Sequence, residues 1–181
     1  MPTLRHVAFL RAINIGGHTV KMAHLRTLFE GLGLKNVETF IASGNVLFDA
    51  PSASADKLES RIEQHLGKAL GYEALTYIRP LASLARVATD HPFVAHAADG
   101  HALSIGFLKA PLSAERAAVL QELGTDYDAF HVTDREVYWL CRGPRMSDSK
   151  LFGKVLDRAI GSPVTFRNVT TVRKLAAKGK E

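Results

Sequence analysis

The fold is decided by the stretch Leu4-Arg5-His6-Val7-Ala8-Phe9-Leu10, followed by Arg11-Ala12-Ile13-Asn14-Ile15-Gly16-Gly17-His18. Val7–Leu10 is a continuously apolar run typical of a central strand, and the residues after Leu10 form a polar loop that enters a helix near Lys21. A second apolar run, Ala102–Leu108, enters its helix after only Lys109-Ala110-Pro111-Leu112. The chain therefore predicts two copies of one pattern, and only the first copy carries an elaborated loop.

The first copy predicts a βαββαβ unit. After the strand, apolar residues recur at helical spacing and predict a helix that ends near Gly33: Met22, Leu25, Leu28, Phe29 and Leu32. Strands 37–42 and 46–48 follow, joined by Ser43-Gly44-Asn45, a hairpin signal because Gly and Asn tolerate positive φ. Small polar residues lead into a second helix with an inward stripe, and 75–78 forms the last strand; the stripe is Leu58, Ile62, Leu66 and Ala69.

The second copy repeats this order with elements offset by roughly ninety residues, the regularity that duplication produces. Ser113 and Ser147 are the expected N-caps of its two helices. The expected elements are strand 102–108, helix 113–123, strands 129–132 and 137–141, helix 147–160, strand 164–166 and a terminal helix, 168–178.

This order predicts an α+β protein of tandem, duplicated ferredoxin-like units packed together, with an extra C-terminal helix. The expected boundaries are 1–79 for the first subdomain, 80–101 for a linker with a short helix, and 102–181 for the second subdomain with the terminal helix. No apolar run approaches the roughly 20 residues that span a bilayer. We therefore expect a cytoplasmic protein without a membrane partner. The single cysteine, Cys141, forms no intramolecular disulfide, and nothing near it in sequence would activate it as a nucleophile.

The loop after the first strand predicts an anion site. It ends at a helix N-terminus, where amide groups and the helix dipole favour negative charge. Gly16 and Gly17 allow close backbone approach, and Arg11 pairs well with phosphate or carboxylate. The other polar groups of this loop that a ligand would contact are Asn14, His18 and Lys21.

A scaffold role for the same residues is an equal alternative. Gly16-Gly17 then only turns the chain, Asn14 bonds its own loop, and Arg11 pairs with Asp49. In such a fold we expect strands 1 and 3 to be parallel neighbours. Residues 49–51 should then lie beside the loop, and the 43–45 hairpin should lie at the opposite sheet edge. Arg167 is either a surface charge or a second anion contact, and Asn168 is the expected N-cap of the final helix.

Other chemistry has little support. No recognised phosphate or dinucleotide motif occurs, so no cofactor is expected. His91, His96 and His101 lie five apart, a spacing that does not place them on one helical face, and no dedicated metal site is expected. The net charge of +5 is concentrated in the last nine residues, which contribute +3, and the aromatic pattern of RNA-binding strands is missing. These features argue against nucleic-acid binding.

The sequence resembles a bacterial family of uncharacterised proteins, domain of unknown function 1697. The resemblance rests on Leu10–Gly17, Lys21-Met22 and Ile41–Val46, and on Thr165–Asn168 with Thr171-Val172 and Lys174-Leu175. The family usually has Leu-Arg-Gly-Ile-Asn-Val-Gly-Gly, Gln-Ser-Gly-Asn and a tryptophan after Arg-Asn, where this chain has Ala12, Ala42 and Val169. The resemblance implies a duplicated α+β protein and no activity. Its motif positions are Arg11, Asn14, Gly16, Gly17, Ser43, Gly44, Asn45, Arg167 and Asn168.

Three functions therefore stay open. The leading one is binding of a small anionic ligand, with His18 as the proton-transfer group if the site is an enzyme's. The favoured alternative for His18 is an exposed loop histidine without a catalytic role, because no partner carboxylate is nearby in sequence. The alternative is a non-catalytic interaction or assembly module, with which a homo-oligomer is compatible. Nucleic-acid binding ranks last, because only the analogy of the fold favours it.

Overall fold

The computed structural model describes residues 3–51 and 55–180, and the chain divides into two compact units. Unit 1 comprises the described residues up to Leu84 together with Lys178–Lys180, and unit 2 comprises Ala85–Ala177. The division at Leu84 falls inside the segment 80–101 that the sequence predicts as a linker. Residues 52–54, in the stretch predicted to lead into a helix, lie outside the described residues.

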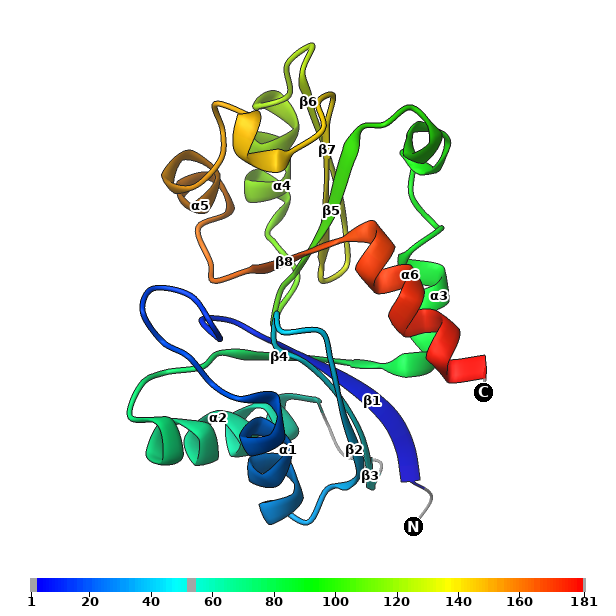
Figure 1. Cartoon of the computed structure of the whole chain (residues 1–181). Helices are drawn as coiled ribbons and strands as arrows, with labels where there is room; N and C mark the ends of the chain where they lie inside the picture. The colour runs from blue at the N-terminus through cyan, green and yellow to red at the C-terminus, as the bar shows by residue number, and fades with distance from the viewer. Residues whose placement is uncertain (1–2, 52–54, 181) are drawn as a thin grey trace. The chain divides into compact units, whose positions relative to one another are not determined.

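Unit 1 is a four-stranded antiparallel sheet with two helices on one face (Figure 1). The strand order β2-β3-β1-β4 is the ferredoxin-like order that the sequence predicts. In chain order the elements are β1 (Thr3–Leu10), α1 (Met22–Gly31), β2 (Lys35–Phe40), β3 (Asn45–Pro51), α2 (Ala55–Leu70) and β4 (Thr76–Pro80).

The core of unit 1 lies between this sheet and its helices. Alternate residues of β1, among them Ala8 and Leu10, face the helices, and Leu25 and Phe29 of α1 are fully buried against them. The predicted stripe of α1 is confirmed, because Met22, Leu28 and Leu32 pack at the margin of the same core. Burial of each large apolar side chain contributes about 1.5–3 kcal/mol, so the amphipathic pattern is sufficient to order these helices on the sheet.

β1 and β3 are antiparallel neighbours, and the expectation of a parallel pair is wrong. In the split βαβ arrangement the crossover makes β1 parallel to β2, and β3 inserts between them in the opposite direction. Asp49 therefore lies opposite Arg5 at the beginning of β1, and the two side chains pair at 3.2 Å. The expected pairing of Arg11 with Asp49 is wrong for the same reason.

Unit 2 has the same architecture, with strand order β6-β7-β5-β8. Figure 1 shows α4 and α5 on one face of this sheet, and α6 continues directly from β8. The elements are β5 (Ala102–Phe107), α4 (Ala114–Glu122), β6 (Asp128–Thr133), β7 (Glu136–Cys141), η3 (Met146–Asp148), α5 (Lys154–Ile160), β8 (Thr165–Asn168) and α6 (Val169–Ala177).

Short helical segments complete the chain. They are η1 (Leu81–Ser83), α3 (Leu84–Val87), η2 (Val94–Ala98) and η4 (Lys178–Lys180). Lys178 pairs with Glu38 and lies 5.6 Å from the centre of the Phe40 ring. Among the described residues, no helix combines the length and apolar character needed to cross a membrane.

The helix predicted over 147–160 is shorter than expected, since α5 begins only at Lys154. Gly153 has a φ of 84°, a left-handed conformation that cannot continue a right-handed helix. Upstream, the buried Ser149 hydroxyl donates to Asp128 at 2.8 Å, which ties this segment to the sheet. Ser147 as an N-cap is therefore wrong, whereas the predicted cap of α4 is confirmed by the Ser113 hydroxyl, which accepts from the Arg116 amide.

Candidate functional site

The β1–α1 loop has an unusual backbone. Four of its residues have positive φ: Ala12 at 65°, Asn14 at 56°, Gly16 at 62° and Gly17 at 86°. Glycine adopts this conformation without strain, but alanine incurs a cost of about 1–2 kcal/mol. Strained backbone of this kind concentrates at functional sites, where the surrounding contacts hold it in place.

Asn14 supplies those contacts. Its Oδ1 accepts a hydrogen bond from the Val20 amide at 2.6 Å, and its Nδ2 donates to the Ala42 carbonyl at 2.9 Å. One side chain thus joins the two ends of the loop and anchors it to the β2–β3 hairpin. The predicted bond of Asn14 to its own loop is confirmed, and we assign it a positioning role.

The hairpin lies beside the loop, and the expectation that it occupies the opposite sheet edge is wrong. The Gly44 carbonyl accepts from the Leu10 amide at 2.8 Å. A Cβ atom added at Gly44 would lie 3.1 Å from Ile13 Cβ and 3.2 Å from Leu10 Cβ. The hairpin therefore packs closely on the end of β1, and the antiparallel direction of β3 makes this contact. Both motif stretches of unit 1 form one local structure.

The N-terminus of α1 is the chemically open part of this structure. Lys21 occupies the N-cap position, and among the described residues no side chain caps the helix. The first turn also contains no acidic residue. The corresponding helix of unit 2, α4, has both a Ser113 cap and Glu115 in its first turn. Of these two corresponding helices, α1 is the one whose leading amide groups have no side-chain acceptor among the described residues.

His18, in the same loop, stacks on an aromatic side chain from another segment of unit 1. Its exposed ring stacks on Tyr72 with 3.8 Å between centroids and 24° between planes. Among the described residues, the buried Tyr72 hydroxyl has no hydrogen-bond partner. Tyr72 follows α2 and thereby brings a second segment of unit 1 to the loop. The stack fixes the position of an imidazole at the solvent boundary.

Arg11 directly follows β1 and is held by residues in and just before β4. Its amide donates to the Leu75 carbonyl at 2.8 Å. Burial raises the pKa of Tyr77, and the guanidinium of Arg11 opposes that rise. The side chain is half-buried beside the Tyr77 hydroxyl. Arg11 therefore has a partner on β4, and we assign it to the support of the loop.

Arg167 and Asn168 lie in unit 2. Asn168 is confirmed as the cap of α6, because its Oδ1 accepts from the Thr170 amide at 2.8 Å. Arg167 is 9% exposed, so the alternative of a surface charge is wrong. Its guanidinium donates to Thr165 Oγ1 at 2.8 Å and to the Phe166 carbonyl at 2.9 Å. Burial lowers the pKa of Arg167 to about 10.

Sequence reasoning missed the counterpart of Arg167. Arg79 pairs with Val7 in the register of unit 1, as Arg167 pairs with Ile105 in unit 2. Both arginines are buried, and Arg79 donates to the carbonyl of its preceding residue, Ile78, as Arg167 does to that of Phe166. An arginine at the same place in the last strand of both copies is the signal that could have revealed this equivalence.

Cys141 does not form a reactive centre. The thiol is fully buried in β7 and its Sγ donates to the Arg145 carbonyl at 3.4 Å. Burial raises the pKa of the Cys141 thiol, which disfavours the thiolate that nucleophilic chemistry requires.

A family model described as Protein of unknown function (DUF1697) matches residues 4–138. This range contains both motif stretches of unit 1 and ends before Thr165. Among solved structures, a conserved bacterial protein from Streptococcus pneumoniae is similar over 99% of this chain and 100% of that chain, with a TM-score of 0.77 and 21% identity. At that identity the likeness shows the fold alone. A search of curated proteins finds no match.

Proposed function

The chain belongs to the DUF1697 family of proteins of unknown function, and we propose that unit 1 binds a small anionic ligand at the N-terminus of α1. The ligand carries a phosphate or carboxylate group. The observation that supports this proposal best is an uncapped helix N-terminus at the end of a loop that Asn14 ties down at two points.

The chemistry of such a site follows from the main chain. The first amide groups of a helix have no partner within the helix, and the dipole adds about half a positive charge there. Lys21 adds a full positive charge, which is unfavourable next to that dipole until an anion compensates it. Gly16 and Gly17 have open space where a Cβ would stand, so a ligand can reach the backbone. His18 is the group that would move a proton if the bound anion reacts.

Lys21→Asp tests the site directly. The new carboxylate would cap α1 and occupy the place of the ligand, so the variant should be more stable than the wild type by about 0.5–2 kcal/mol. In a thermal-shift series with inorganic phosphate and small carboxylates, a ligand at 100 times its Kd stabilises the wild type by about 2.7 kcal/mol. That stabilisation raises the Tm by about 5–10 °C in a protein of this size. We expect Lys21→Asp to lose this shift.

The matched control is Lys150→Asp, which makes the same charge change at an exposed position of unit 2. It should keep the full ligand-induced shift. Equal shifts in the wild type and in Lys21→Asp would contradict anion binding at α1. Short oligonucleotides are tested in the same series, and a shift that they alone produce would favour nucleic-acid binding instead.

A second candidate function is a non-catalytic interaction module. Ile15 is 60% exposed and Ile41 is 52% exposed, on the two segments that the bond from Asn14 to Ala42 joins. Ile41 has a φ of 52°, a costly conformation for a β-branched residue. Exposed apolar side chains on an ordered loop favour contact with another protein surface. Sedimentation equilibrium tests self-association: Ile15→Ser should weaken it, and a monomer at all concentrations would argue against it.

A further inference from the structure

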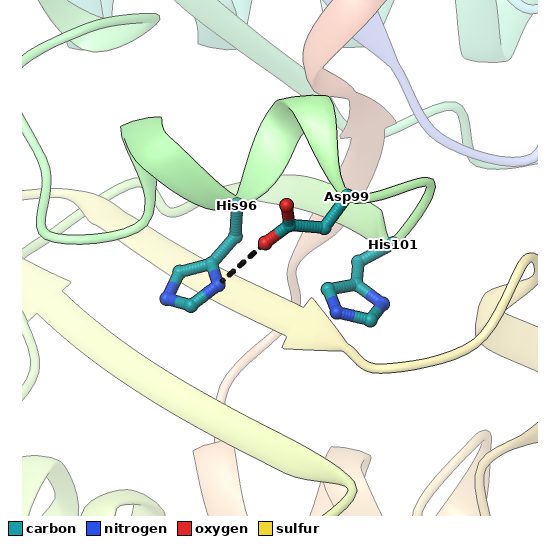
Figure 2. A group of neighbouring side chains, drawn as sticks. All are labelled: His96, Asp99 and His101. Atoms are coloured by element: carbon teal, nitrogen blue, oxygen red, sulfur yellow. Dashed lines mark ion pairs between the residues drawn. The ribbon is translucent and has the colours of Figure 1, made fainter.

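A histidine and carboxylate cluster lies in unit 2, apart in sequence from the loop of unit 1. It comprises His96, Asp99 and His101, and one ligand atom of each lies within 4.8 Å of the other two (Figure 2). His96 Nδ1 is 3.3 Å from Asp99 Oδ2, and the two imidazole centroids are 6.3 Å apart. We propose that these three side chains bind a divalent transition-metal ion, with Zn²⁺ as the expected occupant.

The backbone explains why residues five apart converge. On an α-helix this spacing would place His96 and His101 on different faces, but the segment is the short 3₁₀ helix η2 and a turn. The Asp99 amide donates to the His96 carbonyl at 3.1 Å, which closes the end of η2. Gly100 then has a φ of 72°, so the chain reverses and returns His101 to the side of Asp99. Figure 2 shows the Asp99 side chain between the two imidazoles.

The donor set selects the class of metal. Two imidazole nitrogens and one carboxylate oxygen suit Zn²⁺ and its neighbours in the first transition row, whereas Mg²⁺ and Ca²⁺ prefer oxygen ligands. Ligands on a zinc ion lie about 2.0–2.2 Å from the metal. Small side-chain rotations would therefore have to bring the three donor atoms closer together around the ion. His96 is 38% exposed and Asp99 is 55% exposed, so solvent can reach the cluster and the side chains have room to rotate.

Three protein ligands leave at least one coordination position for water or an exogenous group. The carboxylate of Asp99 also provides the negative charge that offsets part of the metal's charge. An ion pair between His96 and Asp99 would account for the contact between these two residues. It would not account for His101, which the turn at Gly100 brings within reach of both.

The test is a Zn²⁺ titration of the full chain without a polyhistidine tag, followed by calorimetry and by competition with a chromophoric chelator. We expect one Zn²⁺ per chain. His96→Gln and His101→Gln should each weaken binding at least tenfold, because loss of even an outer partner of a metal ligand costs about 10–100-fold in affinity. Asp99→Asn should weaken it as well, and Mg²⁺ in excess should not compete.

His24→Gln is the control, because His24 is exposed on α1 of unit 1. Its affinity should equal that of the wild type. Circular dichroism of each variant checks that the fold is retained. Absence of stoichiometric Zn²⁺ binding to the wild type would overturn the proposal, and so would equal affinity in the wild type and in His101→Gln.

Discussion

Ala12 is the residue at which this chain departs from its family most informatively. The family that the sequence resembles usually has glycine here, and the φ of 65° supplies the physical reason. Ala12→Gly should therefore stabilise the protein by about 1 kcal/mol, measured by urea denaturation. The control is Ala118→Gly at an exposed position in the middle of α4, which should destabilise by about 1 kcal/mol. A loss of stability in both variants would show that Ala12 is not strained.

Gly44 illustrates a second constraint at the scale of one residue. It combines a φ of 78° with a close approach to Ile13 and Leu10, so an added methyl group meets both a conformational and a steric cost. Gly44→Ala should destabilise the fold by about 2–4 kcal/mol in chemical denaturation. Gly33→Ala separates the two costs, because Gly33 has the same φ but open space around it. That variant should lose only about 1–2 kcal/mol, and an equal loss in both would contradict a steric role for Gly44.

At the scale of the element, the edge strand β4 is protected by the helix that precedes it. Glu59 Oε1 accepts from the Ile78 amide and Glu63 Oε1 accepts from the Thr76 amide, each at 2.7 Å. These carboxylates accept hydrogen bonds from amide groups of the edge strand that could otherwise pair with a strand of another molecule. The predicted stripe of α2 identified its apolar face correctly. An acidic residue on a helix is normally predicted to be solvent-exposed, but Glu59 is only 2% exposed. Its role depends on β4, which no local pattern in α2 describes.

Protonation of His91 should lower the stability of the protein in acid. His91 Nδ1 accepts from the Phe93 amide at 3.2 Å, and its ring stacks on Tyr138. Burial lowers the pKa of His91, and the charge of Arg173 lowers it further, against the raising effect of the Ala88 carbonyl. The unfolded chain therefore takes up the proton first, and stability falls as the pH drops below about 6.5 towards the lower folded pKa.

Urea denaturation at pH about 7.5 and about 5 measures this loss. His6 should contribute with the same sign, because burial lowers its pKa too. His91→Gln should therefore reduce the difference between the two pH values without abolishing it. A difference as large as that of the wild type would show that His91 has no part in the acid sensitivity.

At the scale of the whole molecule, the element order and the duplication could be predicted from the sequence, because they follow from apolar periodicity and turn residues. The relation of the two motif stretches could not. The two stretches contact each other at Leu10 and Gly44 because β3 runs antiparallel to β1. That direction is set by the crossover topology of the whole unit, and no local sequence pattern predicts it. The same limit hid Arg79, whose equivalence to Arg167 appears only in the strand registers. The His96, Asp99 and His101 cluster was missed because a helical spacing rule was applied to a turn.

The most direct measurement is a titration of the ¹⁵N-labelled protein with inorganic phosphate, observed through its backbone amide resonances. We predict saturable shifts at Gly16, Gly17 and the first turn of α1, and none at the Ser113-capped N-terminus of α4, which serves as an internal reference. Shifts of equal size at both helices, or at neither, would contradict an anion site built by the β1–α1 loop.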